Sequence, residues 1–568
     1  MRIPQADQRL SDADRTGGNQ TTDAPTRASR GRRNRTAAAN TATRQTILNP
    51  RYFLPDELAR RDDLFAAIAC WDIAALCDSR QPPLSRRLPP NLCQLFSQAL
   101  LTPLLHLSRN PESETGWRLL LFLPRLTLHQ ASPQRLDWPG VKARLRAFQR
   151  GEWEQLYLDT VDAVDTPPPP RHQPDATGVI SRAEGLAKRG SLRRAVLALE
   201  STPVCTPSPE ILEELRQKHP PAVHEAVTWP VPPESKLSIT HAEFAKILGR
   251  CENGVGAGPS GTTFEHMRDA ATTNTMISTH LHTLVNTLLG GNLPGPVANL
   301  LTASRLIALA KPGGGARPIA IGELPGGAET VTHTARAFLD ARPNSLVLQA
   351  DISNAFNSIS RHAIATALHD PKLSPLQPFV KLTYGNPSQL LLDAKFNCEP
   401  LHSERGVRQG DPLGPLLFAA GIHPTLRDTA EAHPNVLCLA YADDVTFLGD
   451  TSRTVAAFMY FTAKLAQLGL TYNPQKCAAW SSTTVTQHQL PPGVPFSKDG
   501  VRLLGSYVGT DVGAAGFLSG QLGEMARPLP LIERADPQVA ALLLTRCISR
   551  RVAYLIRTTP LHLLPRAT

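Results

Sequence analysis

The sequence lacks the patterns that mark secreted, disulfide-linked or membrane-spanning proteins. Its nine cysteines are an odd number, lie far apart and include no C-x-x-C pair, which argues against a disulfide framework and against a zinc knuckle. Residues 1–7 contain no apolar core of a signal peptide. The apolar run Leu119 to Leu123 ends at Pro124, and no run approaches the length that spans a bilayer. We therefore expect a soluble chain in a reducing, intracellular compartment.

Proline and positive charge are plentiful. The 568 residues include 51 prolines, and the formal net charge is +10. Such a length leaves room for about three domains, and a hydrophobic content of 41% is enough for a sizeable core. An excess of positive charge favours a polyanionic partner such as a nucleic acid, although many basic proteins bind none.

Composition shifts along the chain predict its domains. Residues 1–45 lack apolar periodicity, so we expect a disordered basic arm there. The arginines at 30, 32, 33 and 35 could contact phosphates or act as a nuclear address, and a solvated tail is the plain alternative. The remaining parts are a helical N-terminal extension (46–165), a Pro-rich linker (166–180), a second helical region (181–253), a segment with chemical motifs (254–510) and a partial, thumb-like helical segment (511–568).

The order of strands and helices in the motif segment predicts an α+β fold. The expected elements are a strand ending at Asp351, a helix from there to about His369, a helix with Asp411 as N-cap, a hairpin of strands 436–441 and 445–448, a helix over 454–468 capped by Gly469, a strand carrying Lys476, and a strand over 502–508. This order is that of a split βαβ antiparallel sheet with helices on one face. It is the arrangement of a polymerase palm.

Three aspartates stand where such a fold would gather them. Asp351 ends one strand, and Asp443 and Asp444 lie at the tip of the hairpin expected beside it. Joining a nucleotide to a primer 3′-hydroxyl needs an anionic site for two divalent cations about 3.5–4 Å apart. The carbonyl of Ile352 could complete a metal shell. For each aspartate motif taken alone, an ordinary polar turn is the better-supported interpretation.

Seven sequence blocks together resemble the reverse transcriptases of non-LTR, LINE-type retrotransposons, in the family's order. The blocks are 256–261 and 306–319, similar to the fingers motifs; 349–359, similar to motif A; 405–418, similar to motif B; Tyr441-Ala-Asp-Asp444, similar to motif C; 469–476, similar to motif D; and 502–505, similar to motif E. The resemblance implies a right-hand palm and fingers that follow a mostly helical N-terminal extension and a disordered arm.

The resemblance also implies contacts with the incoming nucleotide. Lys311 and Arg317 would pair with triphosphate oxygens, the arginine through its bidentate fork. The plain alternative for both is a basic turn in a loop of glycines and prolines. Phe356 would lie under the deoxyribose and exclude a ribose 2′-hydroxyl by its bulk, and an ordinary buried phenylalanine is its alternative.

Further roles implied by the family concern the base pair and the primer. Gln409 and Gly410 would contact the nucleotide and the template base pair. Lys476 is a candidate acid for the departing pyrophosphate. Leu504 and Gly505 would belong to the primer grip.

The function that the resemblance implies is RNA-directed DNA synthesis. The chain would extend a DNA primer, or a nick in target DNA, with dNTPs on an RNA template, and two Mg²⁺ or Mn²⁺ ions would assist. We expect it in the nucleus or in a cytoplasmic ribonucleoprotein. Endonuclease and RNase H motifs are not found and residues 511–568 are too few for a full thumb. We therefore expect part of a mobile-element protein, or a truncated or domesticated copy.

Two other functions remain open at this point. An inactive or domesticated protein could keep the fold and bind nucleic acid through its basic face. A group II intron-type maturase shares motif B, although the helical extension favours a LINE-type source. An RNA-dependent RNA polymerase would usually carry Gly-Asp-Asp in motif C and a second Asp in place of Phe356.

Overall fold

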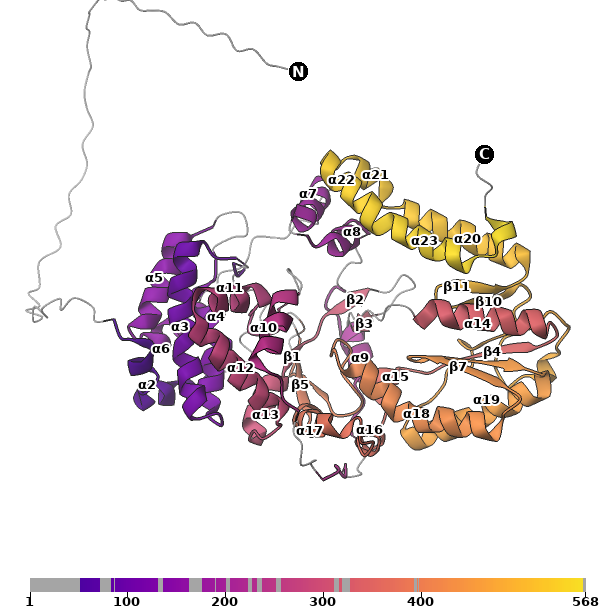
Figure 1. The fold of residues 1–568 in the computed structure, drawn as a ribbon, viewed down its shortest axis with the longest axis horizontal. Coiled ribbons are helices and arrows are strands. Elements are labelled where there is room, and N and C mark those ends of the chain that lie inside the picture. Colours follow the sequence, from indigo (N-terminus) through magenta and orange to yellow (C-terminus); the bar gives the residue numbers. More distant parts are fainter. Residues whose placement is uncertain are drawn as a thin grey trace, which may run out of the picture. The chain divides into compact units, whose positions relative to one another are not determined.

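The structure is a computed structural model (Figure 1). It describes residues 52–71, 83–85, 87–130, 136–162, 176–188, 190–200, 205–222, 227–231, 237–251, 257–310, 316–318, 327–392, 396 and 398–564. The expected basic arm over 1–45 and Lys311 lie outside these ranges, as do residues 166–175 of the expected linker. Residues 176–180 begin a helix.

A helical bundle forms the N-terminal part of the described chain, as the apolar periodicity predicts. Its helices are α1 (Pro55–Leu58), α2 (Asp62–Ala67), α3 (Pro90–Arg109), α4 (Glu114–Thr127), α5 (Trp138–Gln149) and α6 (Trp153–Asp162). The same hydrophobic core includes side chains of α11 (Phe264–Thr273), α12 (Thr275–Leu289) and α13 (Gly295–Thr302). Phe96, Phe122 and Phe148 are almost fully buried in it. Helices that precede the motif segment therefore share one core with the first helices of that segment.

Between α6 and α11 in sequence, the described residues form four more helices. They are α7 (Ala176–Lys188), α8 (Leu192–Glu200), α9 (Pro209–Gln217) and α10 (His241–Arg250). Thr240 starts α10 with a capping box, because its hydroxyl accepts from the Glu243 backbone N–H while the Glu243 carboxylate accepts from the Thr240 N–H. Helices α7 and α8 share a hydrophobic cluster with C-terminal residues such as Val539 and Leu543.

Short strands follow α13. Strands β2 (Ala308–Ala310) and β3 (Ala316–Pro318) pair antiparallel. Strand β1 (Ser304–Arg305) pairs parallel with β5 (Ser388–Leu391), and β5 pairs antiparallel with β6 (Leu401–Ser403).

The central sheet has four antiparallel strands in the order β7-β8-β4-β9, which confirms the predicted α+β fold. The strands are β4 (Leu346–Asp351), β7 (Leu437–Tyr441), β8 (Asp444–Gly449) and β9 (Ala478–Trp480). Leu346, Leu348 and Phe447 point to one face, because successive side chains of a strand alternate. That face packs against α15 (Ala355–Ser358), α16 (Arg361–Ala367), α17 (Gln377–Tyr384), α18 (Gly414–Ala432) and α19 (Thr451–Leu465).

The second face of the sheet is also covered, although the helices predicted within the motif segment all pack on the first face. Val347, Leu448 and Trp480 occupy the alternate positions and form a separate cluster with helix α14 (Gly327–Ala341). Strands β10 (Gly500–Leu503) and β11 (Ser506–Gly509) contribute to it. Figure 1 shows α14 on the side of the sheet opposite to α18 and α19. Because apolar side chains lie on both faces of the sheet, each face must pack against other elements to be buried.

Local differences from the predicted elements have simple causes. The helix expected from Asp351 to His369 is split into α15 and α16, because Ser360 is extended and caps α16 through its side chain. Helix α19 begins at Thr451, earlier than predicted, since the Asp450 carboxylate caps it. Gly469, at a φ of 69°, follows a final 3₁₀ turn and confirms the predicted C-cap.

The expected strand over 502–508 is a hairpin. Its strands β10 and β11 meet at Leu504 and Gly505, whose φ angles of 49° and 78° belong to a tight turn. Helices α20 (Asp511–Ala526), α21 (Leu529–Glu533), α22 (Pro537–Leu543) and α23 (Ser549–Thr558) follow. A π-helical turn joins α22 to α23.

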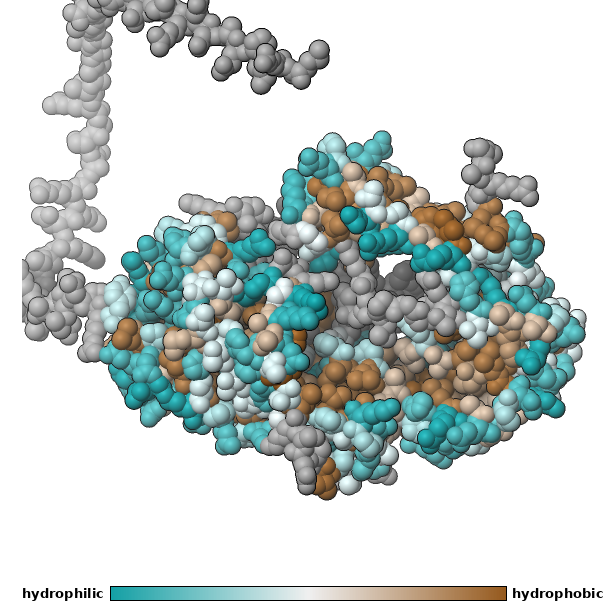
Figure 2. Space-filling model, viewed as in Figure 1, coloured by the Kyte–Doolittle hydropathy of each residue, from teal (hydrophilic) through white to brown (hydrophobic). Residues whose placement is uncertain are grey.

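Some large apolar side chains of the C-terminal helices are exposed (Figure 2). Val512, Leu542 and Ile556 are examples, with exposed fractions of 78%, 43% and 49%. Across the described ranges of the chain, no helix is both long and apolar enough to cross a membrane.

Candidate active site

The three sequence-predicted aspartates lie together at one edge of the central sheet. Asp351 is the last residue of β4 and is the direct cross-strand partner of Asp444, the first residue of β8. Cross-strand partners have Cα atoms about 4.5–5.5 Å apart. Ala442 and Asp443 form the two-residue loop between β7 and β8. The structure therefore brings the strand end and the hairpin tip together, as the sequence pattern predicts.

The site has the electrostatics of a carboxylate cluster. Partial burial, together with the negative charge of Asp351, raises the pKa of Asp443 above its ordinary value. Partial burial and the charges of Asp443 and Asp351 raise the pKa of Asp444 to about 6, although Asp444 keeps contact with solvent. The neighbouring carboxylates disfavour ionisation of Asp443 and Asp444, and a bound cation would relieve that repulsion.

The donor set fits divalent metal ions by its chemistry. Carboxylate and carbonyl oxygens are the ligands that Mg²⁺ and Mn²⁺ prefer. In the part of the chain that the structure describes, no three His, Cys, Asp or Glu side chains are arranged as a ready metal site. Ile352, proposed from sequence as a carbonyl ligand, is buried and forms a β-bridge with Tyr472.

The backbone of Asp351 is held by the segment 471–477. The Asp351 N–H donates to the Cys477 sulfur at 3.4 Å, and the Asp351 carbonyl accepts from the Asn473 N–H at 2.9 Å. The Ser353 N–H donates to the Thr471 carbonyl at 2.8 Å. This segment therefore fixes the peptide groups on both sides of the Asp351 side chain.

Phe356 lies on α15, close behind Asp351 in the chain. Its ring is half-buried and stacks on Phe418 of α18, with ring centroids 4.8 Å apart. Its carbonyl accepts from the Val407 N–H at 2.7 Å. The residue is thus tied to the segment that contains Gln409 and Gly410.

Gln409 and Gly410 lie in the loop before α18. Gly410 is exposed and has a φ of 108°, a conformation that favours glycine. Asp411 is not the N-cap of α18, because the helix begins at Gly414 after a turn. Its carboxylate instead accepts from the Leu413 N–H at 2.9 Å and from the Tyr384 hydroxyl at 2.5 Å. The pattern of Asp followed by Pro marks this turn and not the first residue of the helix.

The remaining predicted residues are placed as follows. Lys476 lies in an exposed turn before β9, so the prediction that it stands in a strand is wrong. The turn forms because the N–H groups of Lys476 and Cys477 both donate to the Asn473 carbonyl. The primer-grip candidates Leu504 and Gly505 form the turn between β10 and β11. Arg317 lies in β3, and Lys311 lies outside the described residues.

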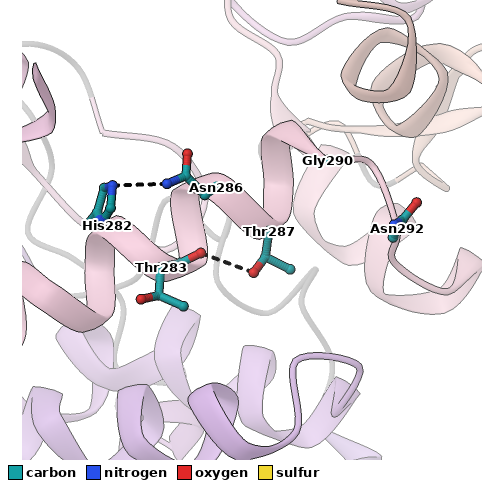
Figure 3. Close-up of a pocket in the computed structure, with 6 residues that line it drawn as sticks. All are labelled: His282, Thr283, Asn286, Thr287, Gly290 and Asn292. Atoms are coloured by element: carbon teal, nitrogen blue, oxygen red, sulfur yellow. Dashed lines mark hydrogen bonds between the residues drawn. The ribbon is translucent and has the colours of Figure 1, made fainter. Parts of the chain in front are cut away.

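A pocket of about 460 Å³ lies along α12 (Figure 3). Its lining residues are His282, Thr283, Asn286, Thr287, Gly290 and Asn292. The Asn286 amide and the His282 ring are hydrogen-bonded to each other at 2.9 Å and to the Ile239 carbonyl. None of the sequence-predicted site residues lines this pocket, and its His282 and Asn286 side chains hold the segment that precedes α10.

Several residues that organise the site were not predicted. Cys477 and Asn473 hold Asp351, while Arg361 and Tyr384 hold the loop with Gln409. Asn473 carries a weak signal, because an Asn-Pro pair favours a turn. The other residues stand in no motif, and their contacts form only in the folded chain.

Comparison with known proteins finds similarities to this part of the chain. Residues 273–508 match the family model described as Reverse transcriptase (RNA-dependent DNA polymerase). The chain is 28% identical to the Retrotransposable element SLACS 132 kDa protein of Trypanosoma brucei gambiense, over 44% of this chain and 24% of that protein. It is 27% identical to the Retrovirus-related Pol polyprotein from type-1 retrotransposable element R2 of Popillia japonica, over 39% of this chain and 37% of that protein.

These matches span only part of each relative, about a quarter and somewhat more than a third. Among solved structures, the RNA-dependent RNA polymerase of a human picobirnavirus has a TM-score of 0.32 at 12% identity. That alignment covers 68% of this chain and 90% of that one.

Proposed function

Because the chain carries a reverse transcriptase domain like those of non-LTR retrotransposons, we propose that it extends a DNA primer with dNTPs on an RNA template. The observation that carries this proposal is the cluster of Asp351, Asp443 and Asp444 at one edge of the sheet. The net charge of +10 suits nucleic-acid partners.

In this proposal the aspartates hold two divalent cations, Mg²⁺ or Mn²⁺. Such ions would lower the pKa of the primer 3′-hydroxyl and stabilise the charge of the departing pyrophosphate. Asp351 and Asp444 project from neighbouring strands, so their oxygens can share a ligand sphere. The raised pKa values of Asp443 and Asp444 support this, because repulsion within the cluster falls when a cation binds.

Other residues would orient the substrates. The half-buried ring of Phe356 would lie under the sugar, and Gln409 with Gly410 would contact the base pair. Lys311 and Arg317 would bind the triphosphate, and Lys476 would protonate the pyrophosphate. Leu504 and Gly505 would hold the primer end, since their hairpin is joined to β4 by a hydrogen bond from Gln349 to the Arg502 carbonyl at 2.8 Å.

The test compares the wild-type chain with Asp443→Asn. Primer extension on an RNA template is measured with Mg²⁺ and with Mn²⁺, and filter binding reports affinity for the primer–template. We expect incorporation by the wild type, none above background by the variant, and nearly equal binding by both, because affinity comes mainly from Lys and Arg contacts with phosphate.

Two results would contradict the proposal. Equal incorporation by Asp443→Asn would remove the aspartate cluster from the chemistry. Binding without incorporation by the wild type, on every primer–template, would instead favour a nucleic-acid-binding protein that keeps the fold.

A further inference from the structure

A buried arginine joins the loops around Gln409 and Gly410. Arg361, the first residue of α16, exposes only 5% of its surface. Its guanidinium donates to backbone carbonyls of Ser403 at 2.8 Å, Tyr384 at 3.0 Å, Asn386 at 3.2 Å and Gly406 at 3.2 Å. Burial, and then the charge of Arg408, lowers the pKa of Arg361 to about 10, so it remains charged at neutral pH. One side chain therefore connects α16 with the end of α17, with β6 and with the start of the loop before α18.

Two guanidinium groups lie close to the Tyr384 ring in this network. The guanidinium carbon of Arg361 is 5.4 Å from the centre of the Tyr384 ring, and that of Arg408 is 4.7 Å away. The Tyr384 hydroxyl donates to Asp411 Oδ2 at 2.5 Å. Burial raises the pKa of Tyr384, which keeps the hydroxyl protonated and able to donate.

Arg408 and Asp411 both contact Tyr384, and they flank Gln409 and Gly410. Arg408 donates to the Thr383 carbonyl at 3.3 Å and forms an ion pair with Asp411 at 3.4 Å. Gln409 and Gly410 are thus the short segment between two anchored residues. Within the described chain, the Gln409 side-chain oxygen is buried without a hydrogen-bond partner. The segment is held from its two ends and not through its own side-chain oxygen.

The start of the loop is tied to the Phe356 helix as well. The Gly406 N–H donates to the Ile359 carbonyl at 3.0 Å. A Cβ atom at Gly406 would come within 2.2 Å of the Phe356 carbonyl oxygen, and its φ of 58° also favours glycine. The loop therefore packs directly on the backbone of α15, with no room for a side chain.

We propose that Tyr384 is a positioning residue for the incoming nucleotide: through Asp411 and Arg408 it fixes Gln409 and Gly410 in the conformation that binds a dNTP. The inference rests on the proposed function and adds a residue that contacts no substrate itself. Arg361 anchors the same loop to α16. Loss of the Tyr384 hydroxyl then loosens nucleotide binding while the aspartate cluster keeps its geometry.

The test is Tyr384→Phe, which keeps the ring beside the two guanidinium groups and removes only the hydroxyl. We expect KM for dNTP to rise about five- to thirty-fold, since a hydrogen bond to a charged group is lost. We expect kcat at saturating dNTP and KM for primer–template to change less than about twofold. The matched control is Tyr460→Phe on α19, whose hydroxyl interacts with Lys464, and it should leave all three constants unchanged.

A double-mutant cycle with Asp411→Asn tests whether Tyr384 acts through Asp411. If it does, the double variant raises KM for dNTP little more than one single variant, because both remove the same interaction. Additive effects would overturn this route. An unchanged KM for dNTP in Tyr384→Phe would overturn the positioning role, and so would a loss of kcat and of thermal stability at unchanged KM.

A binding measurement separates this inference from the proposed function. A primer ended by a dideoxynucleotide cannot be extended, so the next complementary dNTP only traps a ternary complex on a native gel. Tyr384→Phe should need about five- to thirty-fold more dNTP for half-maximal trapping than the wild type. Equal trapping would overturn the positioning role. Trapping by a wild-type chain that never incorporates would overturn the proposed function alone.

Discussion

The hydroxyl of Tyr554, in α23, donates a hydrogen bond to the carbonyl of Leu504, in the turn between β10 and β11. The Ser506 hydroxyl makes a second connection, to the Thr558 carbonyl at 2.9 Å. Leu504 has a φ of 49°, an uncommon conformation for a residue with a side chain. The C-terminal helix thus holds the turn in which the family resemblance locates the primer grip.

Tyr554→Phe should weaken primer use more than nucleotide use. Loss of the hydrogen bond leaves the strained Leu504 peptide less constrained. We therefore expect KM for primer–template to rise about fivefold, which corresponds to the net free energy of one hydrogen bond. KM for dNTP should stay within about twofold of the wild type. Steady-state primer extension with each substrate varied in turn measures both constants. A larger effect on dNTP than on primer would contradict a role for this turn at the primer end.

The ring of Phe356 should control sugar choice. Phe356→Val opens space for a 2′-hydroxyl, so the preference for dNTP over rNTP, as a ratio of kcat/KM values, should fall about ten- to two-hundred-fold. The variant should also lose stability, because the ring packs on Phe418.

Phe517→Val is the matched control for this loss of packing. Phe517 lies in α20 and stacks on Tyr507, outside the central sheet. The Phe517→Val substitution should lower the melting temperature without changing the ratio of kcat/KM values for dNTP and rNTP. An unchanged ratio in an active Phe356→Val variant would show that the ring is only part of the core.

The aspartate cluster should destabilise the metal-free protein at neutral pH. The folded-state pKa of Asp444 is raised from 3.8 to about 6, so the folded chain holds this proton more tightly than the unfolded chain does. This contribution to stability is present below pH 3.8 and is lost as the pH rises through about 6. Asp444→Asn removes the titrating group.

Melting temperatures in EDTA at pH 5 and pH 7.5 test this. We expect the melting temperature of the wild type to fall more from pH 5 to pH 7.5 than that of Asp444→Asn. At pH 7.5 the variant should melt at a higher temperature than the wild type. Added Mg²⁺ should raise the wild-type melting temperature at pH 7.5 and have less effect on the variant. Equal pH dependence in the two proteins would mean that Asp444 has no raised pKa.

The aspartates could be located from the sequence because their signals are local. A strand that ends at Asp351 and a two-residue hairpin at Asp443 are visible in stretches of a few residues, and antiparallel pairing then brings them together. The packing of α14 on the second face of the sheet was not predicted from the sequence. Val347 alternates with Leu346 and Leu348, but an apolar run does not say which helix covers each face.

Tyr384 and Arg361 could not be assigned from the sequence for a different reason. The hydrogen bonds of Arg361 join residues 23 to 45 positions away, and four of the five end on backbone carbonyls, which any residue type provides. No sequence motif or residue spacing indicates such contacts. The link from Tyr384 to Asp411 likewise spans 27 positions, and the Asp–Pro pair alone favoured a helix cap.

The sulfur of Cys477 should position Asp351 by holding its backbone. Cys477→Val keeps an apolar side chain of similar size but removes the sulfur that accepts from the Asp351 N–H at 3.4 Å. A buried N–H without a partner costs about 1–3 kcal/mol, so the variant should melt at a lower temperature. Because the freed peptide also lets the Asp351 carboxylate turn, kcat should fall and the Mg²⁺ concentration for half-maximal activity should rise.

Cys438→Val on β7 is the control, since that thiol packs against the same core without this contact to Asp351. If both variants lose equal stability and neither changes the Mg²⁺ dependence, Cys477 only fills space. If the Mg²⁺ dependence changes in Cys477→Val alone, the sulfur positions Asp351.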